Sequence, residues 1–191
     1  MRRLAALPKA PRLVYMVEHI PGGIGSLMKE TAYLLSRDEL VGKFRKLPVL
    51  NNFENKYLRQ ILSLSKLRMY EPGEQIIEEG QNDRWLYIVI SGEVRVHKGG
   101  EELTRLSHVG DIFGEMNVID GQPRSASIHA VTNTTCLAID ASFLDKLDEQ
   151  DKHPFNAVLY RLFSEILAER LRETDAELAR CRKDLEKYRK A

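Results

Sequence analysis

The sequence predicts a mainly β fold, a sandwich or barrel of short strands, with helices before the strands and one long helix after them. Between residues 67 and 139, apolar or alternating runs recur about every eight to twelve residues with turn residues between them, as in all-β domains. Apolar residues at helical spacing flank this region on both sides. A length of 191 residues with 43% hydrophobic and 30% charged residues suits one domain with appendages.

Composition argues against several classes of protein. A net charge of +1 gives no reason to expect non-specific nucleic-acid binding. No run approaches eighteen apolar residues, so no membrane span is expected, and the basic start is too soon broken by Pro8 to be a secretory signal. Cys136 and Cys181 lie far apart and outside any metal-ligand spacing. A reduced, cytoplasmic setting fits best.

The first 46 residues are predicted to form a partly helical N-terminal arm. Prolines and glycines break any helix before residue 23, and Leu13–Val17 suits either a strand or a segment that docks on the body. From residue 26 to 46 the apolar spacing indicates one or two amphipathic helices, with Asp38 as a cap, through Leu27, Thr31, Leu34, Leu35, Leu40 and Phe44. The arm carries nine Lys/Arg against four Asp/Glu, either as a solvated face or as a partner-docking surface.

Pro48 ends this element, and helical spacing over Phe53–Leu64 predicts a further helix. The period then changes to that of strands, with turns at Glu71–Glu74, Asn82–Asp83 and Gly99–Gly100. The predicted strands are Leu67–Tyr70, Gln75–Glu78, Trp85–Ile90, Glu93–His97, Leu103–Leu106, Ser127–Val131 and Cys136–Ile139. Trp85–Ile90 is the most apolar run and is predicted to be fully buried.

Two helices are predicted at the C-terminal end, a short one over Ser142–Leu147 and a long one from His153–Pro154 towards Lys190. The first half of the long helix has an apolar face that should pack on the strands, made of Phe155, Val158, Leu159, Leu162, Phe163 and Ile166. A second stripe follows at heptad spacing, made of Leu167, Leu171, Thr174, Leu178, Cys181, Leu185 and Tyr188. The stripe favours a parallel homodimeric coiled coil, and packing on the chain's own arm is the alternative.

One stretch, residues 113–126, carries the functional signal. Gly114 lets the backbone approach a ligand closely, Glu115 can accept hydrogen bonds from a hydroxyl, and Arg124 offers a planar fork of donors suited to a phosphate. Taken alone, this acid and this base are equally compatible with a surface ion pair of little energetic value.

The whole string resembles the phosphate-binding cassette of cyclic-nucleotide-binding domains. The fixed positions of that pattern are all present, as Phe113, Gly114, Glu115, Pro123, Arg124, Ser125 and Ala126. Asn117 departs from it, since the family has Ala, Gly or Ser there. The resemblance covers roughly residues 45–175 and implies that the β region is a jelly roll. The expected domains are the arm (1–46), the jelly roll with its lead-in helix (47–152) and the dimerisation helix (153–191).

The resemblance also implies a ligand, a cyclic nucleotide. Arg124 and Ser125 would bind its cyclic phosphate and Glu115 the ribose 2′-hydroxyl, while Gly114 and Ala126 would contribute backbone contacts. The same stretch supplies Phe113 and Met116 as the remaining cassette residues of the predicted site.

The long helix resembles that of bacterial catabolite-activator-type regulators. Thr174 and Asp175 fall where that group contacts adenine, which favours cAMP and leaves cGMP possible, although Asp175 replaces the usual Ser. Arg170 is interpreted either as a partner of Glu115 or as a solvated residue.

Other functions find less support. Metal sites in related cupin-type jelly rolls need a His-x-His pair, which His97, His108 and His129 do not form, so no metal site is predicted. No Ser-His-Asp arrangement or nucleotide-triphosphate loop indicates an enzyme. A DNA-binding module would follow the long helix, where this sequence ends. The sequence therefore predicts a cyclic-nucleotide sensor that acts on a protein effector, with cAMP favoured as the ligand and cGMP as the alternative. The rival hypothesis is an interaction module that has lost its ligand and acts through its coiled coil.

Overall fold

In the computed structural model, the described residues are 13–15, 29–34, 38–51, 53–142 and 149–190. They divide into two compact units, residues 1–147 and residues 148–191, and each unit is treated by itself.

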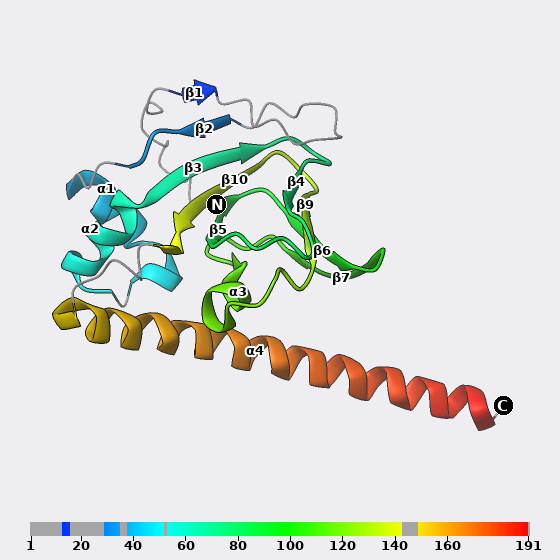
Figure 1. The fold of residues 1–191 in the computed structure, drawn as a ribbon. Coiled ribbons are helices and arrows are strands. Elements are labelled where there is room, and N and C mark those ends of the chain that lie inside the picture. Colours follow the sequence, from blue (N-terminus) through cyan, green and yellow to red (C-terminus); the bar gives the residue numbers. More distant parts are fainter. Residues whose placement is uncertain (1–12, 16–28, 35–37, 52, 143–148, 191) are drawn as a thin grey trace, which may run out of the picture. The chain divides into compact units, whose positions relative to one another are not determined.

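The first unit is a sandwich of two antiparallel sheets (Figure 1). Sheet A has six strands in the order β1 (Leu13–Tyr15), β2 (Lys29–Thr31), β3 (Ser65–Tyr70), β10 (Thr134–Asp140), β5 (Trp85–Ser91) and β8 (Ile112–Phe113). Sheet B has four, in the order β4 (Gln75–Ile77), β9 (Ser127–Ala130), β6 (Val94–Lys98) and β7 (Glu101–Leu106). The predicted mainly β fold with N-terminal helices and a long C-terminal helix is confirmed.

The core is formed by side chains that alternate inward along these strands. Its buried members are Tyr70, Ile77, Tyr87, Val89, Val94, Phe113, Ile128, Ala130, Cys136 and Ala138. β5 is buried at four successive positions, 86–89, as its apolar run predicts. Tyr87 stacks on Phe113 with ring centroids 5.0 Å apart. Burial raises the pKa of the Cys136 thiol to about 12, which keeps it protonated and unreactive.

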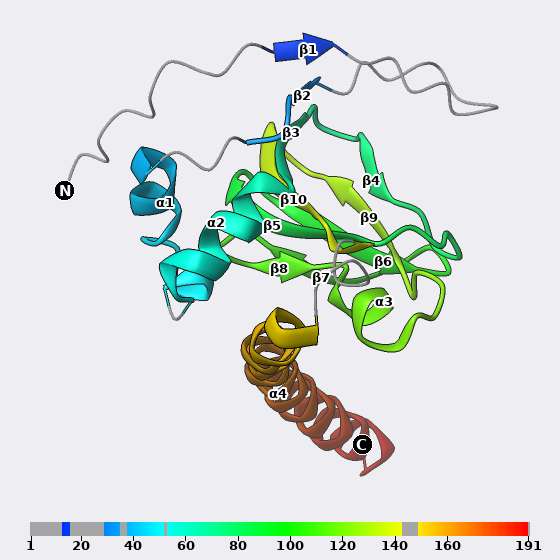
Figure 2. The ribbon, with the colours of Figure 1, turned by 60° about the vertical axis from the view of Figure 1, so that its left-hand side comes forward.

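Helices α1 (Asp38–Phe44) and α2 (Asn55–Ser63) lie side by side at one end of the sandwich, joined through the 3₁₀ turn η1 (Pro48–Leu50) (Figure 2). The predicted helix after Pro48 is therefore present as α2. It buries one face, consisting of Tyr57, Leu58, Ile61 and Leu62, as its apolar spacing predicts.

The prediction for residues 26–46 is partly wrong, because Lys29–Thr31 is a strand and, among the residues of this stretch that the structure describes, only Asp38–Phe44 is α-helical. β2 pairs antiparallel with β3, and β1 pairs with β2. The strand alternative for Leu13–Val17 thus holds for residues 13–15. Glu30 explains the strand, since its buried carboxylate accepts hydrogen bonds from Lys66 Nζ at 2.6 Å and Arg68 Nε at 3.0 Å. Tertiary pairing has overridden the helical spacing.

Arg68 also donates from Nη1 to the Tyr87 hydroxyl at 3.0 Å, and its guanidinium lies 4.0 Å from the centroid of the Trp85 ring. Burial raises the pKa of Tyr87, although Arg68 opposes the shift, so the phenol stays neutral. Glu30, Arg68, Tyr87 and Trp85 together connect β2 to the interior of sheet A.

The second unit is the single helix α4 (Glu149–Lys190). It begins four residues before the predicted start at His153–Pro154. Pro154 lies beyond the first turn of α4, where it lacks the N–H that another residue would donate to the carbonyl four positions earlier, yet the helix continues through it. The proline therefore does not mark the helix start. The heptad stripe is strongly exposed at Leu171, Leu178, Leu185 and Tyr188. Of the predicted helix over Ser142–Leu147, only Ser142 is among the described residues. The side chains of Phe155 and Val158 lie outside them, and packing of α4 on the strands stays a prediction.

Candidate functional site: the 113–126 cassette

Residues 113–126, here called the cassette, run from the end of β8 through a six-residue helix, α3 (Glu115–Asp120), to the turn before β9. Glycines in the left-handed region bracket this helix, Gly114 at φ 81° and Gly121 at φ 67°. A Cβ on Gly114 would lie 2.6 Å from Arg124 Nη1 and 3.0 Å from the Trp85 carbonyl oxygen. The sequence predicts that Gly114 lets the backbone approach a ligand, whereas the group that lies close to it in the structure is Arg124. The approach to a ligand stays a prediction.

Arg124 is buried, with 4% of its surface exposed. Nη1 donates to the Gly114 carbonyl at 2.8 Å, and Nη2 donates to the Trp85 carbonyl at 2.6 Å. Asp83 accepts from Nη2 at 2.6 Å and from Nε at 3.3 Å. These contacts hold the guanidinium in one orientation at the start of α3.

The loop before β5 supplies the rest of this support. The Gly80 N–H donates to the Arg124 carbonyl at 2.9 Å, and the Arg124 N–H donates to the Gln81 carbonyl at 2.8 Å. Asp83 is in turn held by the Trp85 N–H at 3.1 Å. Sequence reasoning did not identify Asp83 as a site residue. Its place in an Asn-Asp turn before a buried strand marks it as a turn residue, but nothing local links it to an arginine 41 positions away.

The other predicted cassette residues fall into buried and exposed groups. Glu115 is buried as the first residue of α3, and Phe113 is buried in the core against Tyr87. Met116 and Ser125 are exposed and lie together, with the Ser125 hydroxyl 3.5 Å from the Met116 sulfur. Ala126 is half-buried directly before β9. The hydrogen bond from Arg124 to the Gly114 carbonyl brings the beginning and the end of the cassette together.

Asn117, the departure from the family pattern, is accommodated by polar contacts. Its side chain is buried, and Nδ2 donates to the Gln122 carbonyl at 2.6 Å and to Asn82 Oδ1 at 3.2 Å. Among the described residues, nothing donates a hydrogen bond to Oδ1 of Asn117. Asn117 therefore ties α3 to both flanking loops and leaves one acceptor unused.

The predicted base-contacting residues lie on α4. The Thr174 hydroxyl donates to the Arg170 carbonyl at 2.9 Å within the helix, and Thr174 and Asp175 are exposed. Because α4 is a separate unit, a joint site of these residues with the cassette stays a prediction. Among the described residues no group of three or more His, Cys, Asp or Glu side chains could hold a metal ion, and no helix is long and apolar enough to cross a membrane.

Comparison with known proteins identifies the region that contains this site. The sequence pattern of the Cyclic nucleotide-binding domain family matches residues 67–151. Residues 67–151 of this chain belong to the cyclic nucleotide-binding domain family. The match spans the cassette, β3 to β10 and every contact of Arg124 described above.

Among relatives of this cyclic nucleotide-binding domain is the Cyclic AMP receptor protein of Thermus thermophilus, 34% identical over 141 residues, which cover 69% of this chain and 60% of the relative. A cGMP-dependent protein kinase of Toxoplasma gondii is 35% identical over 105 residues, 55% of this chain and 10% of the kinase. The chain thus spans less than two thirds of the length of either relative.

Solved structures agree on the fold. The catabolite activator protein of Thermus thermophilus superposes with a TM-score of 0.53 at 34% identity, covering 69% of this chain and 61% of that one. A cyclic nucleotide-binding domain of Methylobacillus flagellatus gives 0.57 at 26% identity, covering 74% and 78%. A protein of Geobacter metallireducens gives 0.62 at 18% identity, covering 68% and 96%, which supports the fold alone.

Proposed function

We propose that this protein is a cyclic-nucleotide sensor that acts without chemistry of its own, through conformational change and contact with a protein effector. The observation that carries the proposal is Arg124, a buried cation held in one orientation by Asp83 and two carbonyl groups within a family-matched cassette. A cation held in this way loses little conformational entropy when an anion binds.

The donor count of Arg124 leaves room for a phosphate. A guanidinium has five N–H groups, and the four contacts described above use four of them. The remaining N–H is on Nη1, and the exposed Ser125 hydroxyl is the next residue along the turn. Glu115, at the start of α3, would accept from the ribose 2′-hydroxyl, and the Gly114 and Ala126 backbones would complete the cradle.

We favour cAMP as the ligand, with cGMP as the alternative. The Thermus relative is named for cyclic AMP and the Toxoplasma relative for cGMP, at nearly equal identity. The positions of Thr174 and Asp175 on α4 favour adenine, and Arg170 would connect that helix to the site through Glu115.

Calorimetric titration with cAMP and, separately, cGMP tests this proposal. We expect one nucleotide to bind per chain at micromolar concentration or below. Arg124→Lys keeps the charge but loses the planar fork, and it should weaken binding at least about tenfold. The matched control is Arg105→Lys, which alters an exposed arginine paired with Glu102 and should leave affinity unchanged. If Arg124→Lys and the unaltered protein bind the nucleotide with equal affinity, the cassette is not the nucleotide-binding site.

One observation favours the rival function, an interaction module without a ligand. Arg124 bonds to Asp83, Gly114 and Trp85, and these contacts would give it a role in stabilising the fold even if the protein bound no phosphate. A folded protein that binds neither nucleotide would therefore favour the rival.

We further propose that α4 forms a parallel homodimeric coiled coil, within the division into arm (1–46), jelly roll (47–152) and dimerisation helix (153–191). Leu171, Leu178 and Leu185 recur every seven residues, and 62%, 47% and 62% of their surfaces are exposed. Leu178→Glu should dissociate the dimer in sedimentation experiments, whereas Ala179→Glu, one position off the stripe, should not. Unchanged mass in both variants would refute a dimer through this stripe.

The two free cysteines suit a reducing compartment such as the cytoplasm.

A further inference from the structure

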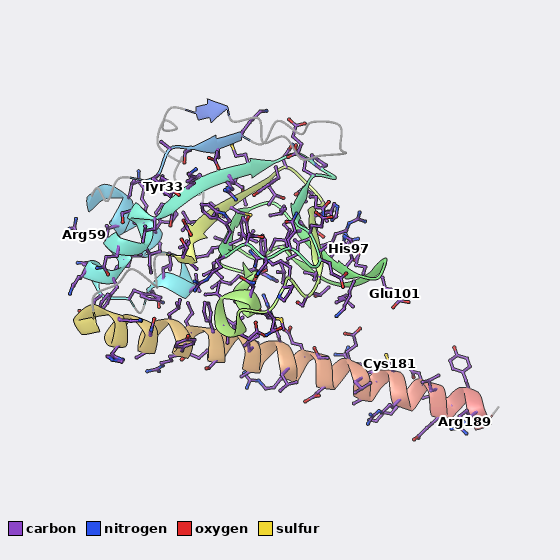
Figure 3. The ribbon with its side chains drawn as sticks, viewed as in Figure 1. Tyr33, Arg59, His97, Glu101, Cys181 and Arg189 are labelled. Carbon is purple, nitrogen blue, oxygen red and sulfur yellow. The ribbon has the colours of Figure 1, made fainter. Side chains whose placement is uncertain are left out.

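Two histidines from different strands meet on sheet B. His97 lies on β6 near its turn into β7 (Figure 3), and His129 lies on β9, which pairs with β6. His97 Nε2 and His129 Nδ1 are 2.8 Å apart, and the ring centroids are 4.7 Å apart with the planes tilted by 39°. His97 and His129 are 32 residues apart in the sequence, so they do not form a His-x-His pattern.

The pair lies on the outer face of sheet B, away from the core. Successive strand residues point to opposite faces, and the inward set of β6 and β9 includes Val94, Ile128 and Ala130. His129 is opposite Arg95 in the β6–β9 register, so both histidines belong to the outward set. Both histidines are half-buried, and the two facing nitrogens are in contact with each other.

A contact of 2.8 Å between two ring nitrogens requires that one donates and the other accepts, so at most one proton lies between them. Metal ions ligate neutral imidazole, so a bound metal ion would take the place of this shared proton.

We propose that His97 and His129 form a two-imidazole chelate for a divalent late transition-metal ion, with Cu²⁺ the ion that fits best. A metal about 2.0 Å from each nitrogen would subtend about 90° at a nitrogen separation of 2.8 Å. That is the cis angle of the square-planar or tetragonal coordination that Cu²⁺ prefers with nitrogen and oxygen ligands. Tetrahedral Zn²⁺ would need the nitrogens about 3.3 Å apart.

The surroundings decide how strong the chelate is. Glu102 of β7 is opposite His97 in register and is the nearest acidic residue across that strand pair, although Arg105 now holds its carboxylate at 2.7 Å. Gln75 of β4 is opposite His129 on the other side. Water would fill the remaining positions. Arg95, opposite His129 in register, repels a cation, so we expect micromolar rather than tighter binding.

The proposal does not rest on nucleotide binding. The metal would cross-link β6 to β9 on the outer face, whereas Arg124 is buried next to the β8–α3 junction.

Titration of tag-free full-length protein with Cu²⁺ tests the proposal, with calorimetry for stoichiometry and electron paramagnetic resonance for the coordinating nitrogens. A Cys181→Ser background is needed because an exposed thiol competes for copper and reduces it. We expect one Cu²⁺ per chain and two imidazole nitrogens. His97→Gln and His129→Gln should each weaken binding at least about tenfold, because a chelate loses its second, effectively intramolecular contact.

The matched control is His108→Gln, which removes a histidine whose side chain is 90% exposed, and it should leave copper affinity unchanged. Thermal unfolding of each variant verifies that it is folded. Equal copper affinity in the two pair variants and the control, or a spectrum with a single imidazole nitrogen, would overturn the proposal. Failure to bind one equivalent would show that the pair is a hydrogen bond only.

Discussion

Two buried arginines lie on either side of Trp85, and they are held in different ways. Arg68 lies over the Trp85 ring and bonds to side chains, those of Glu30 and Tyr87. Arg124 bonds to the Trp85 carbonyl, to the Gly114 carbonyl and to one side chain, Asp83. Backbone acceptors survive most substitutions and side-chain acceptors do not. The Arg68 cluster should therefore be fragile to single mutations and the Arg124 cluster robust.

The largest effect is expected at Glu30. Glu30→Gln removes the carboxylate, 4% exposed, that pairs with both Lys66 and Arg68. Within the described part of the chain, no other carboxylate is seen to pair with these two cations. Breaking one partner of a buried pair costs about 3–5 kcal/mol in the free energy of unfolding. Urea denaturation measures this loss in the free energy of unfolding, and Glu71→Gln is the control.

Glu71 also pairs with a lysine, Lys29, but at 67% and 40% side-chain exposure. Glu71→Gln should therefore cost less than about 1 kcal/mol. Similar losses in both variants would mean that β2 is not held by its buried carboxylate.

The same two clusters show what sequence can and cannot reveal. Most strands from residue 65 onward are predictable because their alternation or apolar runs are local, as in β5 and β6. The two-residue strand β8 is not among the predicted strands, because it is too short to show a period. Lys29–Thr31 has no such pattern, and its strand depends on partners 36 and 38 residues away. Arg124 is recognisable because its motif is contiguous.

What sequence leaves out of the site is non-local as well. Asp83 and Asn82 reach the cassette only through the fold, and the contact between His97 and His129 arises from the register of β6 with β9. The six-residue helix α3 is too short for a periodicity to show.

The next largest effect is expected at Gly114, the one position where the Arg124 cluster is sensitive. Gly114→Ala would place a Cβ 2.6 Å from Arg124 Nη1 and force an L-residue to φ 81°. We expect a loss of about 2–3 kcal/mol in the free energy of unfolding, from strain and overpacking together.

Gly121→Ala is the control at the other end of α3. It imposes the same sign of φ, but nothing lies within 4 Å of its Cβ, so only about 1 kcal/mol should be lost. If both variants lose the same free energy of unfolding, the close approach of Arg124 to Gly114 does not add to the cost of a side chain at Gly114.

Asp83→Asn tests the robustness of Arg124 directly. The amide keeps an acceptor, the Asp83 side chain is 36% exposed, and the two carbonyl contacts remain, so we expect only about 1 kcal/mol. Measured beside Glu30→Gln in the same urea series, this variant should be clearly the milder. A loss as large as that of Glu30→Gln would contradict the distinction between backbone-held and side-chain-held arginines.

The smallest effect is expected at Asn117, where the cassette departs from its family. Asn117→Ala removes the bonds to Gln122 and Asn82, each worth about 0.5–1.5 kcal/mol. It also removes a buried Oδ1 that accepts no hydrogen bond from the described residues, and an unsatisfied buried acceptor costs about 1–3 kcal/mol. The two contributions oppose each other, so urea denaturation should show a net change below about 1 kcal/mol.

Asn82→Ala, which removes only the 3.2 Å bond, is the control for the lost contact alone. A loss above about 2 kcal/mol in Asn117→Ala would mean that Oδ1 is satisfied in solution, by bound water for example. In that case Asn117 would hold α3 against the 82 and 122 loops as firmly as the carbonyls hold Arg124.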